Sequence, residues 1–217
     1  MASFKISIRT GGRADREPSD FVSSYIGTII CTDDETGEQS KVGKLTAVRV
    51  HAGLAQDAGE NLFDVCDAFH QELADLHALL YDPDGYSFRE PLMLRFEAME
   101  PDLLVLDYVV LNPKWRKLRL GLFAVRQFVD LVGGGCGLAV SYIAPLHHDG
   151  ARLMGLPKSW IPHHETKHGS RAAAVRLRKY FRRMGFKRLG RTPYYALPMN
   201  LIVPDTTELL GGGPQEA

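Results

Sequence analysis

Long apolar runs are absent from this chain of 217 residues. A membrane-spanning helix needs about 20 consecutive apolar residues, whereas the strongest run, Leu103 to Leu111, is short and contains Asp107. The first residues alternate apolar and polar side chains, which is typical of a strand and not of a secretion signal. We therefore expect a cytoplasmic protein without a membrane partner.

Cysteine pairs are also absent. Cys31, Cys66 and Cys136 lie far apart and form no C-x-x-C motif, which is typical of a reducing compartment. We expect all three to behave as small apolar side chains, and we assign no catalytic role to them. Nor does the chain contain an H-E-x-x-H motif, so we predict no metal site.

The net charge is zero, with 26 basic and 26 acidic residues, but the two halves differ strongly. Residues 1–112 contain 9 Lys or Arg against 20 Asp or Glu, whereas residues 113–217 contain 17 against 6. This asymmetry predicts either an anion-binding C-terminal half or attraction between the halves, within one fold or in a homodimer. With 45% hydrophobic residues, we expect one domain over residues 1–204 and a flexible tail over 205–217.

The apolar periodicity predicts an α/β protein. We expect strands at 4–9, 21–31, 42–51, 103–111, 136–143, 186–191 and 194–200. A helix capped by Asn61 is predicted to run without a break to about Tyr81, because apolar residues recur on one face every three or four positions. Further helices are expected at 122–132 and 171–184, the second ended by Gly185. The order of elements predicts a mixed sheet with one parallel crossover.

The segment after the strand 103–111 carries the clearest chemical signal. Pro113 fixes the end of the strand, and a basic loop of Lys114, Arg116, Lys117 and Arg119 leads into a helix near Gly121. The first N–H groups of a helix lack intrahelical acceptors and carry partial positive charge. With four cations added, this junction predicts a phosphate or pyrophosphate site. Neither a P-loop nor a G-x-G-x-x-G fingerprint is present.

The run LNPKWRKLRLG, residues 111–121, resembles the pyrophosphate loop of the GNAT N-acetyltransferases, V-x-P-x-x-[RQ]-x-x-G-x-[GA]. Arg116 falls on the Arg/Gln position and Gly121 on the last glycine, while Arg119 replaces the first glycine. The resemblance implies that acetyl-CoA binds as co-substrate, with its pyrophosphate on the loop and its pantetheine arm on the strand. The implied contacts are Val109, Val110, Leu111, Arg116, Lys117, Leu118, Arg119, Leu120, Gly121 and Leu122.

A second motif, LRKYFRRMGF at residues 177–186, is similar to the helix-to-strand signature A-x-x-L-Y-x-x-x-G-F of the same family. The two motifs cover about residues 103–200, and residues 1–102 form a divergent N-terminal half. The resemblance implies a centrally splayed mixed sheet flanked by helices, and transfer of an acetyl group to a small-molecule or peptide amine.

The sequence indicates the catalytic residues less directly than it indicates the cofactor site. At the position of the family tyrosine, which protonates the departing thiolate, this chain has Phe181, so we assign the acid role to the adjacent Tyr180. Asp107 lies inside an apolar strand, where burial would raise its pKa, and we assign it the role of general base. The alternatives are a core tyrosine and a structural carboxylate paired with an arginine.

Residues 145–170 are rich in proline, glycine and histidine, and we interpret them as a substrate-facing loop. One of these histidines acting as the base is an alternative, and His164 and His168 have the spacing of a two-ligand metal site on a helix. The five histidines are His147, His148, His163, His164 and His168.

Two other functions compete with acetyl transfer. Phe181 favours a non-catalytic module that only binds acyl-CoA. The stretch 171–191, with nine Lys or Arg and no acid, would suit a protein directed to RNA or tRNA. We do not expect nucleic acid as the partner, because these cations have anionic targets in the cofactor and in the acidic half, and exposed aromatics are not interleaved with them.

Overall fold

A computed structural model describes residues 2–9, 17–83, 85–116, 120–146, 155–161 and 167–200, without the side chains of 2–9, 167 and 168. The strands are β1 (Ala2–Arg9), β2 (Val22–Thr32), β3 (Gln39–Val50), β4 (Asp102–Leu111), β5 (Cys136–Tyr142), β6 (Lys187–Arg188) and β7 (Tyr194–Pro198). The α-helices are α1 (Ala52–Ala58), α2 (Leu62–Phe69), α3 (Gln71–Leu80), α4 (Glu90–Phe96), α5 (Leu120–Val132) and α7 (Lys167–Arg182). Short 3-10 turns are η1 (Pro18–Phe21), η2 (Pro113–Trp115) and η3 (Lys158–Trp160).

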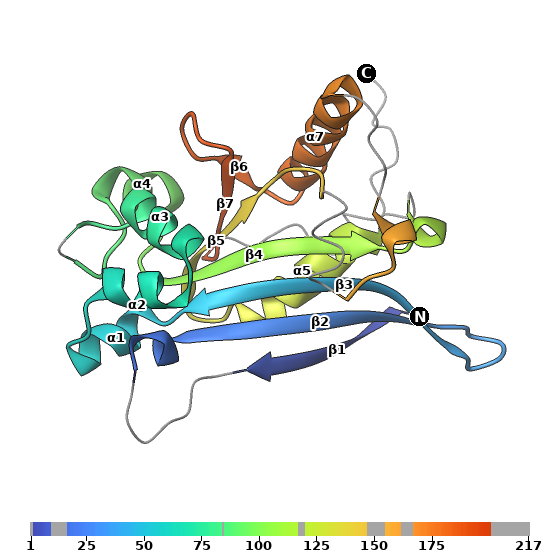
Figure 1. Ribbon diagram of the computed structural model, residues 1–217, viewed down its shortest axis with the longest axis horizontal. Coiled ribbons are helices and arrows are strands. Elements are labelled where there is room, and N and C mark those ends of the chain that lie inside the picture. The colour runs from blue at the N-terminus through green and yellow to red at the C-terminus, as the bar shows by residue number, and fades with distance from the viewer. Residues whose placement is uncertain are drawn as a thin grey trace.

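The described strands form one sheet in the order β1-β2-β3-β4-β5-β7-β6 (Figure 1). Only β4 and β5 pair in parallel, and α5 makes the crossover between them. The predicted mixed α/β sheet with one parallel crossover is thus confirmed. The predicted strands at 21–31 and 42–51 form an antiparallel hairpin, β2 and β3, whose β-branched and aromatic residues suit a half-buried pleated surface.

Two apolar layers cover the sheet. On one face α5 and α7 pack through Phe128, Val129 and Phe181. On the other face α1 to α4 gather at the end of the sheet where β3 ends and β4 begins (Figure 1). Leu76 and Leu80 of α3 are completely buried there. Both layers bury the apolar stripes that the sequence places at helical spacing.

The predicted continuous helix over residues 61–81 is wrong. Asn61 caps a helix as expected, because its side chain accepts from the backbone N–H groups of Phe63 and Asp64. This helix ends at His70, whose extended backbone separates α2 from α3 and whose Nδ1 accepts from the Leu73 N–H at 3.2 Å. A histidine that caps the next helix therefore interrupts an apolar period that continues across it.

Other boundaries differ in detail. Helices α1 and α4 were not predicted; α1 ends at Gly59, in the left-handed conformation that glycine tolerates. Helix α7 begins at Lys167, before the predicted start at 171, and β6 has two residues in place of 186–191. Gly185, with φ of 94°, takes the predicted left-handed conformation after α7.

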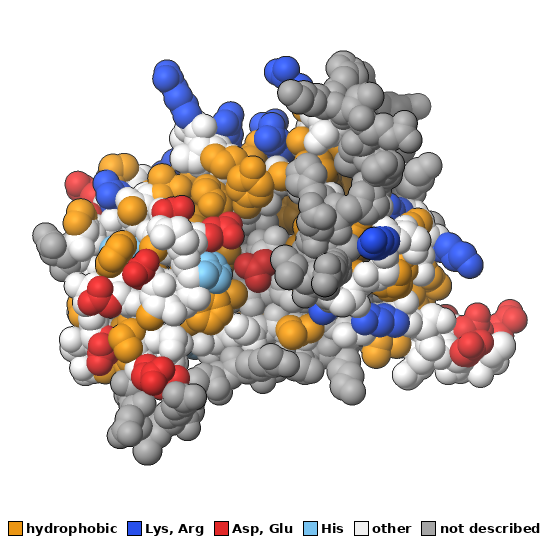
Figure 2. Space-filling model, viewed as in Figure 1, with side chains coloured by type: hydrophobic (Ala, Val, Ile, Leu, Met, Phe, Trp, Pro, Cys, Tyr) orange, Lys and Arg blue, Asp and Glu red, His pale blue; other side chains and the backbone are white. Residues whose placement is uncertain are grey.

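The charge asymmetry of the sequence is visible on the surface. In Figure 2 carboxylates cover the end that carries α1 to α4, while lysines and arginines project along the edge formed by β6 and α7. Cys66 and Cys136 are buried as expected, and Cys31 is partly exposed. Within the described parts of the chain, no helix is long and apolar enough to cross a membrane.

Candidate functional site

A β-bulge lies in the middle of β4. Tyr108 pairs with Thr46 of β3, and Leu106 pairs with Ala47, so Asp107 is an additional residue without a partner on β3. The bulge also shifts the alternation of side chains. Leu106 and Val109 both contact the α5 layer, although an unbroken strand would turn residues three apart to opposite faces.

Strands β4 and β5 separate just before the bulge. Their pairing ends at Leu106 and Ser141, where the Ser141 hydroxyl donates to the Leu106 carbonyl oxygen at 3.0 Å. Beyond this point β5 rises away from β4 in Figure 1. Among the described residues, 108–111 pair with β3 alone, and Asp107 pairs with neither strand. The other edge of this half-strand consequently has backbone groups that an extended ligand could pair with.

Asp107 is a carboxylate with altered chemistry. Its Oδ2 accepts from the Thr46 hydroxyl at 3.2 Å, and one side of the carboxylate remains open to solvent. Asp107 is exposed at the surface, but neighbouring protein atoms withdraw its carboxylate partly from water, and this is the largest cause that raises its pKa to about 6. The negative charge of Glu72 raises the pKa further, whereas Thr46 and His70 act in the opposite direction.

The side chain of Tyr180, a residue of α7, lies against the beginning of α5. A Cβ added to Gly121 would lie 2.8 Å from the Tyr180 hydroxyl oxygen and 3.3 Å from the Leu111 side chain. The hydroxyl also accepts from the backbone N–H of Leu122, which lowers its pKa, but burial dominates and raises the pKa to about 12. The tyrosine therefore stays protonated, and it satisfies one of the free amides of the helix N-terminus.

The Arg116 side chain turns back onto the protein. Its Nε and Nη2 donate to the Leu111 carbonyl oxygen at 3.1 and 2.9 Å, and Nη2 also donates to the Trp160 carbonyl oxygen. Burial lowers the pKa of its guanidinium. Arg116 thereby connects the end of β4 to η3, and Trp160 packs beside Val110 of β4.

The predicted site residues fall into separate groups. Leu111, Gly121 and Tyr180 meet at one point, and Leu120 and Val109 pack against the same core. Asp107 lies four positions before Leu111, which is about 13 Å along a strand. Lys117, Leu118 and Arg119 lie outside the described residues, as do the side chains of His147, His148, His163, His164 and His168.

Phe181 lies in the core. It is 9% exposed, and its ring meets Phe186 edge to face at 5.3 Å. Among the described side chains, no group of three or more His, Cys, Asp or Glu could hold a metal ion.

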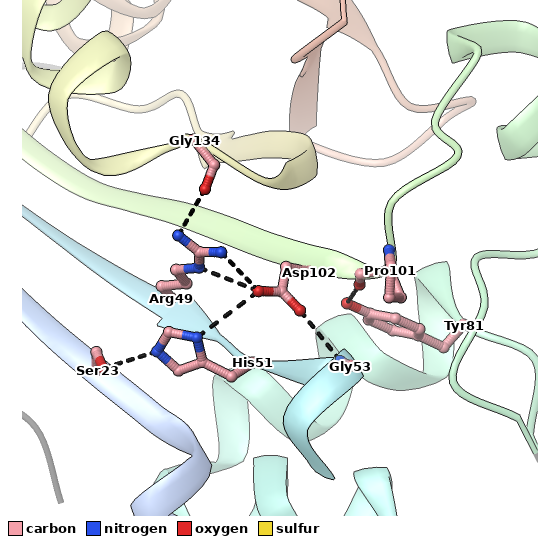
Figure 3. Close-up of polar contacts among 8 residues, drawn as sticks. All are labelled: Ser23, Arg49, His51, Gly53, Tyr81, Pro101, Asp102 and Gly134. Atoms are coloured by element: carbon pink, nitrogen blue, oxygen red, sulfur yellow. Dashed lines mark hydrogen bonds and ion pairs between the residues drawn. The ribbon is translucent and has the colours of Figure 1, made fainter. Parts of the chain in front are cut away.

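A second polar cluster, which the sequence did not reveal, lies where β4 begins (Figure 3). The Ser23 hydroxyl and His51 Nε2 are 2.8 Å apart, and His51 Nδ1 lies 3.6 Å from Asp102 Oδ2. The same Asp102 oxygen accepts from Arg49 Nε and Nη2 at 3.1 and 2.7 Å. Asp102 Oδ1 accepts from the Gly53 amide.

The residue types of this cluster match a hydrolytic triad, but the geometry indicates a structural role. Ser23 is only 3% exposed, so a substrate cannot reach its hydroxyl. Asp102 is held mainly by Arg49, which also donates to the Gly134 carbonyl oxygen. Burial by itself raises the pKa of Asp102, but His51, Arg49 and the Gly53 amide together lower it below its ordinary value. The cluster joins β2, β3, β4 and α1.

Comparisons of the chain with protein-family models, with curated proteins and with solved structures find no match.

Proposed function

We propose that this protein binds acetyl-CoA and transfers its acetyl group to an amine, as a GNAT-like N-acetyltransferase. The observation that carries the proposal is the separation of β4 from β5 at Leu106 and Ser141, directly before a loop and a helix N-terminus. A ligand with an extended arm and a phosphate end suits an unpaired strand edge that leads to a helix N-terminus.

The residues around this separation fit such a ligand in part. The edge of residues 109–111 offers backbone groups other than the Leu111 carbonyl oxygen, which accepts from Arg116. The N-terminus of α5 offers partial positive charge for phosphate oxygens, although its Leu122 amide already donates to Tyr180. Arg116 fits less well, because its guanidinium is already bonded to Leu111 and Trp160. In our proposal the backbone, and not this side chain, therefore holds the pyrophosphate.

Acetyl-CoA supplies a thioester whose carbonyl carbon an amine can attack. The nitrogen forms a bond to this carbon, the carbon–sulfur bond breaks, and the thiolate leaves with the electron pair and takes up a proton. Asp107 removes the proton that an ammonium must lose before it attacks. With a pKa of about 6 this carboxylate is ionised at neutral pH and remains a useful base.

Tyr180 lies farther from the proposed reacting centre than Asp107, because its hydroxyl oxygen accepts from the Leu122 amide at the start of α5. The hydroxyl proton is still available to donate, which keeps Tyr180 as the proposed acid. A non-catalytic acyl-CoA-binding protein is the second candidate, and the burial of Phe181 in the core is the observation that favours it.

Calorimetric titration with acetyl-CoA tests the proposal, with 3′,5′-ADP and pantetheine titrated separately. We expect saturable binding of acetyl-CoA, and weaker binding of each fragment, because each retains only some of the contacts. No binding of acetyl-CoA would overturn the proposal. Tight binding without acetyl transfer over a broad set of amines would leave the second candidate.

A further inference from the structure

A histidine is enclosed at the end of α3. His77 lies in the last turn of this helix and is only 3% exposed. Its ring stacks on Tyr81, with the ring centroids 5.4 Å apart, and meets the ring of Phe63 from α2 edge to face at 5.7 Å. The imidazole therefore connects α3 to α2 through an aromatic contact.

The ring has no partner for a positive charge. Among the described residues, none forms a hydrogen bond with His77 Nε2, and no Asp or Glu forms an ion pair with the ring. The charged group that acts on it is Arg89, which donates to the carbonyl oxygens of Ala78 and Tyr81 at the end of α3. Burial, followed by the charge of Arg89, lowers the pKa of His77. The imidazole is therefore neutral at neutral pH.

The two tyrosine hydroxyls near the ring are already engaged. The hydroxyl of Tyr81 donates to the Pro101 carbonyl oxygen at 2.7 Å, and that of Tyr86 donates to the Glu60 carbonyl oxygen at 2.8 Å. Protonation would give both nitrogens of His77 an N–H group. A buried imidazolium without an acceptor is costly, and exposure of the ring to water removes this cost.

A small cavity adjoins the ring. It has a volume of about 40 Å³ and is lined by His77, by residues 61–63 at the start of α2, and by residues 83, 85 and 86 of the turn after α3. Atoms beside a cavity lack contacts on one side. Phe63 is also 43% exposed, so its ring can leave the imidazole with little loss of packing. Here the ring reaches water with the smallest loss of contacts.

We infer that His77 is an acid-sensitive latch that holds the start of α2 and the turn after α3 together. With a neutral ring, these segments close over the imidazole. Once the ring is protonated, they separate from it and water reaches Nε2. The latch is independent of the proposed acetyl transfer, because it lies on the face of the sheet opposite α5 and α7.

The sign of the pH dependence follows from the lowered pKa. An ordinary histidine has a pKa of about 6.5, and the pKa of His77 is lower in the closed arrangement. Closure is therefore complete above the ordinary pKa and weakens as the pH falls from there toward the lower pKa. For a ring that stays neutral while enclosed, the open fraction rises about tenfold from pH about 7.5 to about 5.5.

Two buried cysteines report the opening within one molecule. Cys66 lies in α2 and is 1% exposed, whereas Cys136 begins β5, packs in the α5 layer and is 4% exposed. Burial raises the pKa of each thiol to about 12, so each reacts only after its surroundings open. Labelling with dithiodipyridine, which reacts with thiols in acid, is followed by peptide mass spectrometry. The ratio of the two rates separates opening of α2 from unfolding of the chain.

In the wild-type protein we expect the ratio of Cys66 to Cys136 labelling to rise about tenfold over this pH range. His77→Phe keeps an aromatic ring that cannot be protonated, and the ratio should then stay constant within about twofold. His70→Asn is the matched control, because it removes an exposed histidine between the same helices and keeps a capping side chain. The rise should persist in this variant. A ratio independent of pH in the wild-type protein, or an equal rise in His77→Phe, would overturn the inference.

A titration of the wild-type protein by NMR tests the latch even if His77→Phe fails to fold. The ring of His77 should keep the signals of a neutral imidazole at pH about 6, where an ordinary histidine is mostly protonated. A protonated ring at this pH, with the rate of Cys66 labelling unchanged, would also overturn the inference.

Discussion

In its first half, from Asp102 to Leu106, β4 lies between β3 and β5. Among the described residues, 108–111 pair with β3 alone and Asp107 pairs with neither strand. Each half contains one aspartate. Asp102 is held by Arg49 and the Gly53 amide, and its pKa is lowered; Asp107 has a threonine hydroxyl and an acidic neighbour, and its pKa is raised to about 6. One strand therefore carries a structural carboxylate and the carboxylate that we propose as the base, and the difference in their pKa values lies in their neighbours.

The largest expected effect on stability comes from removing the charge of Asp102, at the beginning of β4. Asp102→Asn keeps an acceptor for the Gly53 amide but leaves Arg49 without its counter-charge, and we expect the free energy of unfolding to fall by about 3 kcal/mol. Urea denaturation at neutral pH measures this loss. The control is Asp130→Asn, an exposed pair with Arg126 one helical turn away, where we expect a loss below about 0.5 kcal/mol. Equal losses would contradict the distinction.

The pH dependence of this contribution has a definite sign. The pKa of Asp102 is lower in the folded protein than its ordinary value. The stabilisation is therefore complete above the ordinary pKa and is lost as the pH falls through the folded pKa. The wild-type protein and Asp102→Asn should become more alike in stability as the solution is acidified.

At the reactive end we expect a loss of activity without a loss of stability. Asp107→Asn should lower kcat/KM about a hundredfold, because the amide cannot accept the ammonium proton. Initial acetylation rates with the amine well below its KM measure this effect across a pH series. In the wild-type protein kcat/KM should rise with pH around 6, as the carboxylate loses its proton. A profile without this step, or an unchanged rate in the variant, would remove Asp107 as the base.

The smallest expected effect concerns the contact between α7 and α5. Gly121→Ala should lower the free energy of unfolding by about 1 to 2 kcal/mol, because its Cβ would lie 2.8 Å from the Tyr180 hydroxyl oxygen. Tyr180→Phe removes that atom, and the ring carbon behind it lies at an ordinary 3.7 Å. The double variant should therefore lose less than the sum of the two single variants. Additive losses in a thermal denaturation cycle would show that the two residues do not touch.

The sequence predicts much of the fold because its signals are local. The alternation along 42–51 and the apolar run at 103–111 each depend on residues close together in the chain, and the structure confirms both strands. The helical period over 61–81 is correct for both α2 and α3, but it does not reveal the extended backbone of His70. Apolar periodicity shows which face of a helix is buried, but it does not show the hydrogen bonds that end the helix.

The candidate site could be predicted only in outline. Asp107 stands out in the sequence as an acid within an apolar strand, but the bulge that leaves it unpaired depends on the register with β3. Arg49 and Asp102 are far apart in the chain, and only pairing between β3 and β4 brings them together.

By itself the sequence determined the strand and helix types, the basic loop before α5 and the glycine that ends α7, because each of these depends on neighbouring residues. The tertiary structure decided which carboxylate is neutralised and which remains reactive. It also decided that Arg116 turns inward and that the Tyr180 hydroxyl meets α5. These outcomes depend on which charges and how much water surround each group, and only the folded arrangement sets those surroundings.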